Sequence, residues 1–316
     1  MSDPKQNEEK SSVDMGQFGP SMAHMPSSAE KIDAPYPLDD PQMSEQLTFF
    51  QAATGIQDPE ELKAHIFEIR NEACKAFPFP CILLFYFLQG MIAHHPFYHN
   101  VRKDIENNTA TRKIFIDIGG GMGTDLRQTI YYGWNRNDVL GVEIEPKWEP
   151  LGHKLFRDSD RPIPYFIGNV LESKVLDAAS SAKVEDVTQV DLHSLQNLNP
   201  LKGAARFITL NQVFHFFDEE GQRQLAERCA LLLSDEVGSS IFGMHVGGVN
   251  KAVDAASLKM FAHSPQTWKE LWESVFAPRK VQVVSELIEV ESDAHFISLF
   301  PDTKSMHRLY WSVTRL

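Results

Sequence analysis

Residues 114–126 read IFIDIGGGMGTDL, and this stretch decides the fold. An apolar run, Ile114 to Ile116, ends in the acid Asp117, and glycines follow at positions 119, 120, 121 and 123. The next segment, LRQTIYYGW, has a helical pattern. Glycine permits positive φ and a close backbone approach to a ligand. A buried strand, a glycine turn and a helix N-terminus together predict a nucleotide-binding corner.

The spacing of the glycines indicates which nucleotide binds. The pattern D-x-G-x-G-x-G starts at Asp117, whereas a dinucleotide fold requires G-x-G-x-x-G. Counted from Gly119, the last position of that motif is Thr124, and counted from Gly121 it is Leu126, so a nicotinamide dehydrogenase is disfavoured. An acid at the strand end suits a ligand with an ammonium group and no pyrophosphate. S-adenosylmethionine fits this description; the alternative is a left-handed turn without a ligand.

Two further strands place polar groups at the same edge. Residues 138–144, DVLGVEI, predict a strand ending at Glu143, which lies 20 residues after Gly123. This is the usual separation between a glycine turn and the acid that holds the ribose hydroxyls, and a carboxylate accepts from both vicinal hydroxyls. Residues 164–170, PYFIGNV, predict a third strand with Asn169 at its carboxyl end. An amide there can hydrogen-bond the adenine edge.

Composition narrows the partners. The chain has 316 residues, 42% hydrophobic and 23% charged, as expected of a globular protein. The net charge of −13 argues against nucleic acid and favours a small-molecule partner. Cys74, Cys81 and Cys229 are too few and too scattered for a disulfide framework or a zinc site, so we expect buried free thiols and no metal.

The sequence shows no targeting or membrane segment. Residues 1–30 lack the apolar core of a secretory signal, and the longest apolar run, residues 81–88, is too short to span a bilayer. We therefore expect a cytoplasmic protein that does not insert into membranes.

Three regions are expected along the chain. Residues 1–40 are polar and aperiodic and predict a disordered tail. Residues 41–108 predict a helical lid that caps the substrate. In it, Asp58 caps a helix with an apolar stripe at positions 62, 66 and 69, and an apolar helix spans Cys81 to Ala93. Plain packing is the alternative for the second helix. Residues 109–316 form the nucleotide-binding domain.

The remaining pattern alternates strands and helices. Residues 206–210 and 239–246 predict strands, and residues 280–290 and 307–314 predict two closing antiparallel neighbours. Helices are expected over residues 148–156, after Asp218 and from Ser264 onward. Residues 171–205 predict a helix plus a linker that cross over the sheet.

Histidines supply the candidates for catalysis. His215 and His245 each follow the carboxyl end of a strand, where α/β sheets bind ligands. Either can act as a base or donate a hydrogen bond to the acceptor; packing among phenylalanines is the alternative for His215. His94 and His95 are adjacent at a helix end, so they diverge and cannot chelate one metal together.

Four stretches carry a family resemblance: FPFPCILLFYFL with HPFYHNV, FIDIGGGMGTDLR, LGVEIEPKWEPLGHKLFRD, and LNQVFHFFDEEGQ with FGMHVGG. The chain resembles class I S-adenosylmethionine-dependent methyltransferases and, more closely, the fungal secondary-metabolite methyltransferases that esterify carboxyl groups in meroterpenoid pathways. The resemblance spans residues 58–314. It implies an α/β fold: a doubly wound, mostly parallel, Rossmann-like sheet with one antiparallel edge strand and an N-terminal helical lid.

The resemblance also implies the residues that bind the cofactor. With the glycine turn and the end of the fourth strand included, the predicted set is Asp117, Gly119, Gly121, Gly123, Glu143, Ile144, Asn169, Val170 and Asn211. The family usually has aspartate at the positions of Glu143 and Asn169. Glutamate still holds a diol, and asparagine can still meet the adenine amine through its carbonyl.

The acceptor decides what chemistry is required. A carboxylic acid with a pKa near ~4 is already ionised at neutral pH, whereas a phenol near ~10 needs a base. We expect an O-methyltransferase acting on the carboxylate of an aromatic or terpenoid metabolite, as a monomer or homodimer. The alternatives are a phenolic O-methyltransferase with His215 or His245 as base, and a catalytically silent regulatory partner. The intact glycine motif and Glu143 argue against the silent partner.

Overall fold

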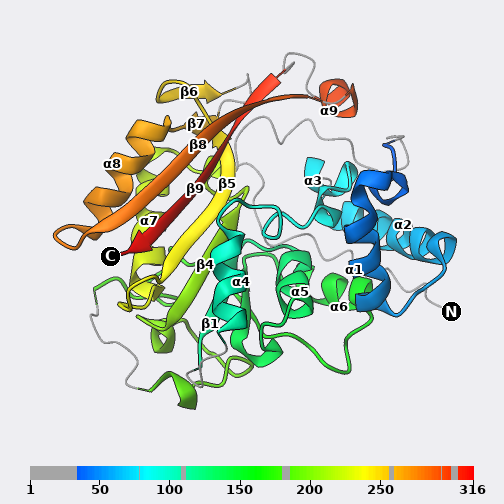
Figure 1. The fold of residues 1–316 in the computed structure, drawn as a ribbon, viewed down its shortest axis with the longest axis horizontal. Helices are drawn as coiled ribbons and strands as arrows, with labels where there is room; N and C mark the ends of the chain where they lie inside the picture. The colour runs from blue at the N-terminus through cyan, green and yellow to red at the C-terminus, as the bar shows by residue number, and fades with distance from the viewer. Residues whose placement is uncertain are drawn as a thin grey trace, which may run out of the picture.

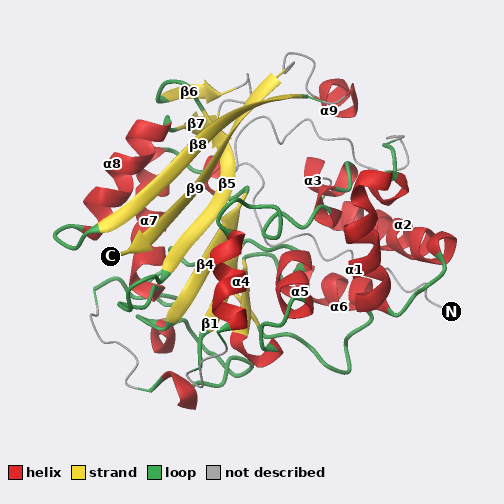
Figure 2. Cartoon of the chain, in the orientation of Figure 1, coloured by secondary structure: helices red, strands yellow, loops and turns green. Residues whose placement is uncertain are grey.

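The fold is built on one seven-stranded sheet (Figures 1 and 2). The structure is a computed structural model, and it describes residues 34–77, 79–107, 112–179, 186–255, 260–292, 294–299 and 305–316. Its strand order is β3-β2-β1-β4-β5-β9-β8. The strands are β1 (Ile114–Ile118), β2 (Val139–Glu143), β3 (Tyr165–Ile167), β4 (Ala205–Asn211), β5 (Ser240–Gly247), β8 (Val281–Glu291) and β9 (Ser305–Arg315). A separate hairpin joins β6 (Ala252–Ala255) and β7 (Met260–Ala262).

The sheet is parallel from β3 to β5, and β9 is its one reversed strand. β9 pairs antiparallel with both β5 and β8, so it is second from the edge and β8 runs with the others. The predicted mostly parallel, Rossmann-like fold is confirmed. The strand order reverses between β1 and β4, and α/β sheets bind ligands beyond the carboxyl ends at such a point.

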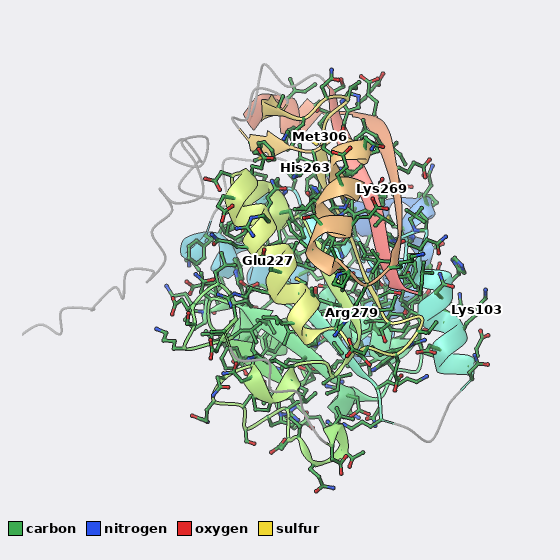
Figure 3. All side chains as sticks on the ribbon, turned by 90° about the vertical axis from the view of Figure 1, so that its left-hand side faces the viewer. Lys103, Glu227, His263, Lys269, Arg279 and Met306 are labelled. Carbon is green, nitrogen blue, oxygen red and sulfur yellow. The ribbon has the colours of Figure 1, made fainter. Side chains whose placement is uncertain are left out.

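Helices cover both faces of the sheet because strand side chains alternate. The helices are α1 (Ser44–Thr54), α2 (Pro59–Ala76), α3 (Pro80–Leu83), α4 (Tyr98–Glu106), α5 (Thr124–Tyr131), α6 (Trp148–Phe156), α7 (Glu219–Leu232), α8 (Pro265–Phe276) and α9 (Ala294–Leu299). On β1, Ile114 and Ile116 pack in the cluster that includes Trp268 of α8. Phe115 points the other way and packs with Leu126 of α5. Figure 3 shows the face of the sheet that α7 and α8 cover; Glu227 marks α7 and Lys269 marks α8.

The N-terminal helices α1, α2 and α3 group beside α6, on the side of the molecule away from α8 (Figure 1). Asp58 caps α2 by accepting from the Glu61 N–H, as predicted. The predicted stripe of Leu62, Ile66 and Ile69 is buried, in a cluster that includes Phe156 of α6. The stripe therefore docks this segment onto the sheet domain.

Two N-terminal expectations need correction. The helix expected from Cys81 to Ala93 is wrong: α3 ends at Leu83 and a 3-10 turn covers residues 86–88. Phe85 takes a left-handed φ of 59° and is fully buried, so packing of its ring overrode helix propensity. In the predicted tail, residues 1–33 lie outside the described residues, whereas residues 34–40 are packed onto the core by the buried Ala34, Tyr36 and Leu38.

Some of the remaining expectations are confirmed and others are wrong. Cys74 and Cys229 are buried free thiols as expected, whereas Cys81 is exposed. The helices at residues 148–156, after Asp218 and after Ser264 are confirmed, the last with a capping box. Within residues 171–205, the described part contains 3-10 turns and no α-helix, so the crossover helix is not found there. The β6–β7 hairpin was not expected. No helix in the described part of the chain is long and apolar enough to cross a membrane.

Candidate functional site

A cavity of about 380 Å³ lies beyond the carboxyl ends of the parallel strands. Its floor comes from the ends of β1, β2, β4 and β5 and from the turns that follow them. The segment between α2 and α4 contributes apolar walls: Phe77, Phe79, Ile82, Tyr86, Phe87 and Met91. The volume is in the range of small-molecule sites, and the walls are mostly apolar, as such sites require.

The glycine turn shapes one wall of this cavity. Gly119, Gly121 and Gly123 have φ of +78°, +55° and +71°, values that favour glycine. A Cβ on Gly119 would lie 2.5 Å from Val213, whereas a Cβ on Gly121 would meet nothing within 4 Å. Because Gly121 lines the cavity, its missing side chain leaves room there for a ligand.

Side chains that sequence reasoning missed hold this turn in place. Tyr165 of β3 donates its hydroxyl to the Gly121 carbonyl at 3.2 Å. Arg127 donates to the Met122 carbonyl at 2.9 Å and forms a buried, bidentate pair with Asp158 at 2.8 and 3.0 Å. Burial raises the pKa of Asp158, but hydrogen bonds from His153 and Arg127 outweigh it and lower that pKa below its usual value. No motif spacing links these residues.

Buried carboxyl groups crowd the turn. Asp117 is 1% exposed, and its Oδ2 has no hydrogen-bond partner. Burial, Asp125 and Glu143 raise the pKa of Asp117 well above its usual value. Burial also raises the pKa of Asp125 to about 6, although the Ile92 N–H donates to it. An unpaired, buried carboxyl group beside two others provides a site for a cation.

Glu143 lies at the end of β2, as predicted. Its two oxygens accept from the N–H groups of Gly121 and Ile144, both at 2.9 Å. Burial raises its pKa, and these hydrogen bonds oppose the rise. Each carboxylate oxygen can accept a second hydrogen bond, so a diol can still bind.

The remaining predicted cofactor residues differ in role. Ile144, Asn169, Val170 and Asn211 all line the cavity. The Oδ1 of Asn169 accepts from the Leu171 N–H at 3.0 Å, and that of Asn211 accepts from the Met244 N–H at 3.1 Å. Both amides are thus held by backbone.

Gly123 is not among the lining residues; it is the N-cap residue of α5. A Cβ there would lie 2.2 Å from the Tyr165 hydroxyl. Eight of the nine predicted residues therefore meet at one cavity.

Only one of the predicted catalytic histidines reaches this cavity. His215 lines it, and its Nδ1 is buried without a hydrogen-bond partner. Burial lowers the pKa of His215 to about 4, so its imidazole is neutral at pH 7.

The other histidines serve packing. His245 is fully buried and points to the α8 face, where its Nδ1 accepts from Trp311 at 2.9 Å. Burial, with His215 and His263, lowers the pKa of His245 well below its usual value. His95 bonds the Gly243 carbonyl at 3.0 Å through Nε2. His245 therefore lies outside the site proposed for it.

The strained residue Gln212 is a further group that sequence reasoning missed. It follows β4, takes a left-handed φ of 59° and lines the cavity with its Oε1 unpartnered. Non-glycine residues in this region cost energy and gather at functional sites.

The site suits a cationic nucleoside better than a metal ion. Asp117 supplies an uncompensated carboxyl group, Glu143 a diol acceptor and Gly121 an open wall. In the described residues, no group of three or more His, Cys, Asp or Glu side chains is placed to hold a metal. The arrangement fits S-adenosylmethionine, with its ammonium, sulfonium and ribose diol.

Comparisons with known proteins point the same way. The meroterpenoid methyltransferase N-terminal domain matches residues 36–88. The O-methyltransferase phiE of a fungal species (strain ATCC 74256) is 27% identical over 241 residues, 75% of this chain and 73% of that protein. The asnovolin E/chermesin D methyltransferase nvfJ of Aspergillus novofumigatus is 30% identical over 219 residues, 68% of this chain and 70% of that protein. The methyltransferase adrK of Penicillium roqueforti is 28% identical over equal shares.

Proposed function

Since the chain belongs to the meroterpenoid methyltransferases of fungal secondary metabolism, we propose that it transfers a methyl group from S-adenosylmethionine to a carboxylate of an apolar, terpenoid-like acceptor. The observation that carries the proposal is the buried Asp117 at the end of β1, whose Oδ2 has no hydrogen-bond partner, beside the open wall at Gly121. A buried charge without a partner is costly unless a ligand compensates it.

Different residues of the cavity would bind different groups of the cofactor. Asp117 would hold the ammonium group, Glu143 the ribose hydroxyls and Asn169 the adenine edge. When bound, S-adenosylmethionine supplies an electrophilic methyl group on a cationic sulfur. The apolar walls exclude water and orient the acceptor, which is most of what an in-line displacement requires.

The segment spanning residues 41–108 would act as a lid over the acceptor. It contributes Phe79, Ile82 and Tyr86 to the cavity wall, although no long helix is present in residues 81–93. The stretch between α2 and α4 lines the same cavity as the carboxyl ends of the sheet strands. Binding of an apolar acceptor against these rings buries apolar surface and is stabilised by that burial.

His215 favours a carboxylate over a phenol as acceptor. With its pKa lowered to about 4 by burial, the imidazole is a weak base and is poorly matched to a phenol near ~10. A carboxylate is already ionised and needs only a hydrogen bond for orientation. A neutral imidazole can donate one such bond.

Alkali lability of the product tests the proposal. A fungal metabolite extract is incubated with the enzyme and S-adenosylmethionine, and new methylated species are identified by mass spectrometry. Methyl esters revert to the starting mass in mild alkali, whereas aryl methyl ethers do not. We expect alkali-labile products. Alkali-stable products would favour the phenolic alternative, and no methylated product at all would favour a silent partner.

A further inference from the structure

Arg308 of β9 is a cation that the proposed mechanism has not used. It is the one Lys or Arg among the described residues that line the cavity. Its Nε is buried without a hydrogen-bond partner, and within the described part of the chain it forms no ion pair. Arginine stays charged at all physiological pH values, so this cation has no partner in the cavity wall.

The reversed strand explains how Arg308 reaches the site. In the sheet register, Arg308 lies opposite Val246 of β5 and Ile288 of β8. Val246 is one residue from the end of β5, so Arg308 sits at the ligand-binding edge of the sheet. Opposite residues share a face, and Val246 also lines the cavity. Both cross-strand neighbours are apolar and offer the guanidinium no acceptor.

The cavity therefore separates its charges. Most of the lining carboxyl groups gather at the ends of β1 and β2 and the start of α5. Burial, Asp125 and Glu143 set the pKa of Asp117 without a cation among the causes. Arg308 lies on β9, three strands away from β1 in the sheet order. Glu291 also lines the cavity, yet no ion pair joins it to Arg308 in the described residues. A cationic ligand suits one end and an anionic ligand the other.

We propose that Arg308 binds the carboxylate of the methyl acceptor and so makes the enzyme selective for acids over the matching alcohols. This inference rests on the proposed carboxyl methylation and adds the residue that recognises the negative charge of the acceptor. The planar guanidinium donates two parallel hydrogen bonds to one carboxylate, which leaves the apolar skeleton against the aromatic walls.

A matched pair of fluorescent probes tests the anchor. Pyrenebutyrate and pyrenebutanol share one polycyclic skeleton and differ only in carboxylate against hydroxyl. Energy transfer from tryptophan, including Trp148 in the cavity wall, reports binding with S-adenosylhomocysteine present. In the unchanged protein we expect the acid to bind roughly 10- to 100-fold more tightly than the alcohol, the range of a charged hydrogen-bonded contact. Equal affinities, or no binding of the acid, would overturn the proposal.

Variants assign the preference to Arg308. Arg308→Met should abolish the preference for pyrenebutyrate over pyrenebutanol, Arg308→Lys should retain part of that preference, and Arg279→Met should leave it unchanged. Arg279 is the control because it is exposed, pairs with Asp235 and lies at the other end of the β8–β9 pair (Figure 3). A preference that persists in Arg308→Met would overturn the anchor.

Two further measurements distinguish the acceptor's carboxylate from the cofactor's carboxylate, and the Arg308 proposal from the proposed carboxyl methylation. S-adenosylhomocysteine affinity, measured by calorimetry, should be unchanged in Arg308→Met. A loss there would assign Arg308 to the cofactor's own carboxylate and overturn the acceptor role. An Arg308-dependent preference without any ester product would contradict carboxyl methylation while leaving the anchor in place, whereas ester formation with no acid preference would contradict the anchor alone.

Discussion

The two ends of the cavity are built differently. The acid end consists of Asp117, Asp125 and Glu143, which come from two neighbouring strands and the start of helix α5 within 27 residues of sequence. The acceptor end combines residues from the α2–α4 segment, the turn after β4 and β9, separated by more than 200 residues. The first end is fixed by local backbone geometry, and the second depends on how distant segments pack.

Because of this difference, the residues of the acceptor end can vary, whereas those of the acid end cannot. Carboxyl groups at the ends of adjacent parallel strands meet wherever the strands pair. Aromatic walls at positions such as Phe79 and Phe216 can change size without altering the sheet. Acceptor specificity can therefore differ among proteins that keep one cofactor corner.

The largest effect is expected at the open wall. Gly121→Val places a branched side chain in the cavity at a φ of +55°, so S-adenosylmethionine binding should become undetectable by calorimetry. Gly55→Val is the matched control, since Gly55 also has a positive φ of +74° and open space but lies outside the cavity. Gly55→Val should bind normally; equal losses in both variants would mean that backbone strain, not ligand exclusion, causes the defect.

A smaller loss is expected at the diol acceptor. Glu143→Ala removes the carboxylate that holds Gly121 and Ile144, so affinity for S-adenosylmethionine should fall roughly 10- to 100-fold. Glu220→Ala, on the exposed face of α7, is the control and should bind like the unchanged protein. Unaltered affinity in Glu143→Ala would remove the ribose from this position.

Asp117→Asn should separate binding from stability. Because the pKa of Asp117 is higher in the folded protein than in the unfolded chain, stability falls as the pH rises from the ordinary aspartate pKa through the raised one, and the penalty disappears below the ordinary value. At pH 8 the ligand-free variant should therefore be more stable by about 1–3 kcal/mol in denaturant unfolding, yet bind S-adenosylmethionine more weakly. A variant that loses stability would show that the carboxylate is already satisfied.

The smallest effect is expected at His215. If its imidazole only orients a carboxylate, His215→Gln keeps appreciable turnover, and the rate of the native enzyme stays flat between pH 6 and 8, above the pKa of about 4. If the histidine were a base for a phenol, its loss would cost on the order of 10²–10⁴-fold. A dead glutamine variant together with a steep pH–rate profile would transfer the mechanism to the phenol.

Sequence reasoning reached the acid end because its signals are local. The order of acid and glycines at 117–123 and the separation of Glu143 from the turn follow from one strand–turn–helix unit and its neighbour. Sequence reasoning did not find the side chains that hold the glycine turn, because they come from other elements. Tyr165 reaches the turn from β3, and Asp158, just after α6, pairs with Arg127.

The acceptor end could not be predicted in the same way. The apolar run at 81–93 has the composition of a helix, but burial of Phe85 folds it into short turns. His245 lies near the carboxyl end of the predicted strand at residues 239–246, yet strand alternation points it to the α8 face, where it packs on Trp268. Arg308 carries no motif, and only the register of β9 brings it to the cavity.

The pH dependence of S-adenosylmethionine binding tests the central claim that the acid end holds a cation. Calorimetry between pH 8 and 5 compares it with methylthioadenosine, which has the same nucleoside but neither the ammonium nor the sulfonium. Burial, Asp125 and Glu143 raise the pKa of Asp117, which would hold the ammonium group, well above its usual value, and burial raises the pKa of the neighbouring Asp125 to about 6. Because a cation binds the ionised carboxylates, affinity for S-adenosylmethionine should fall as the pH drops through 6, by roughly 10-fold one pH unit below that value. Methylthioadenosine should bind equally throughout. Parallel curves for the two ligands would contradict the account.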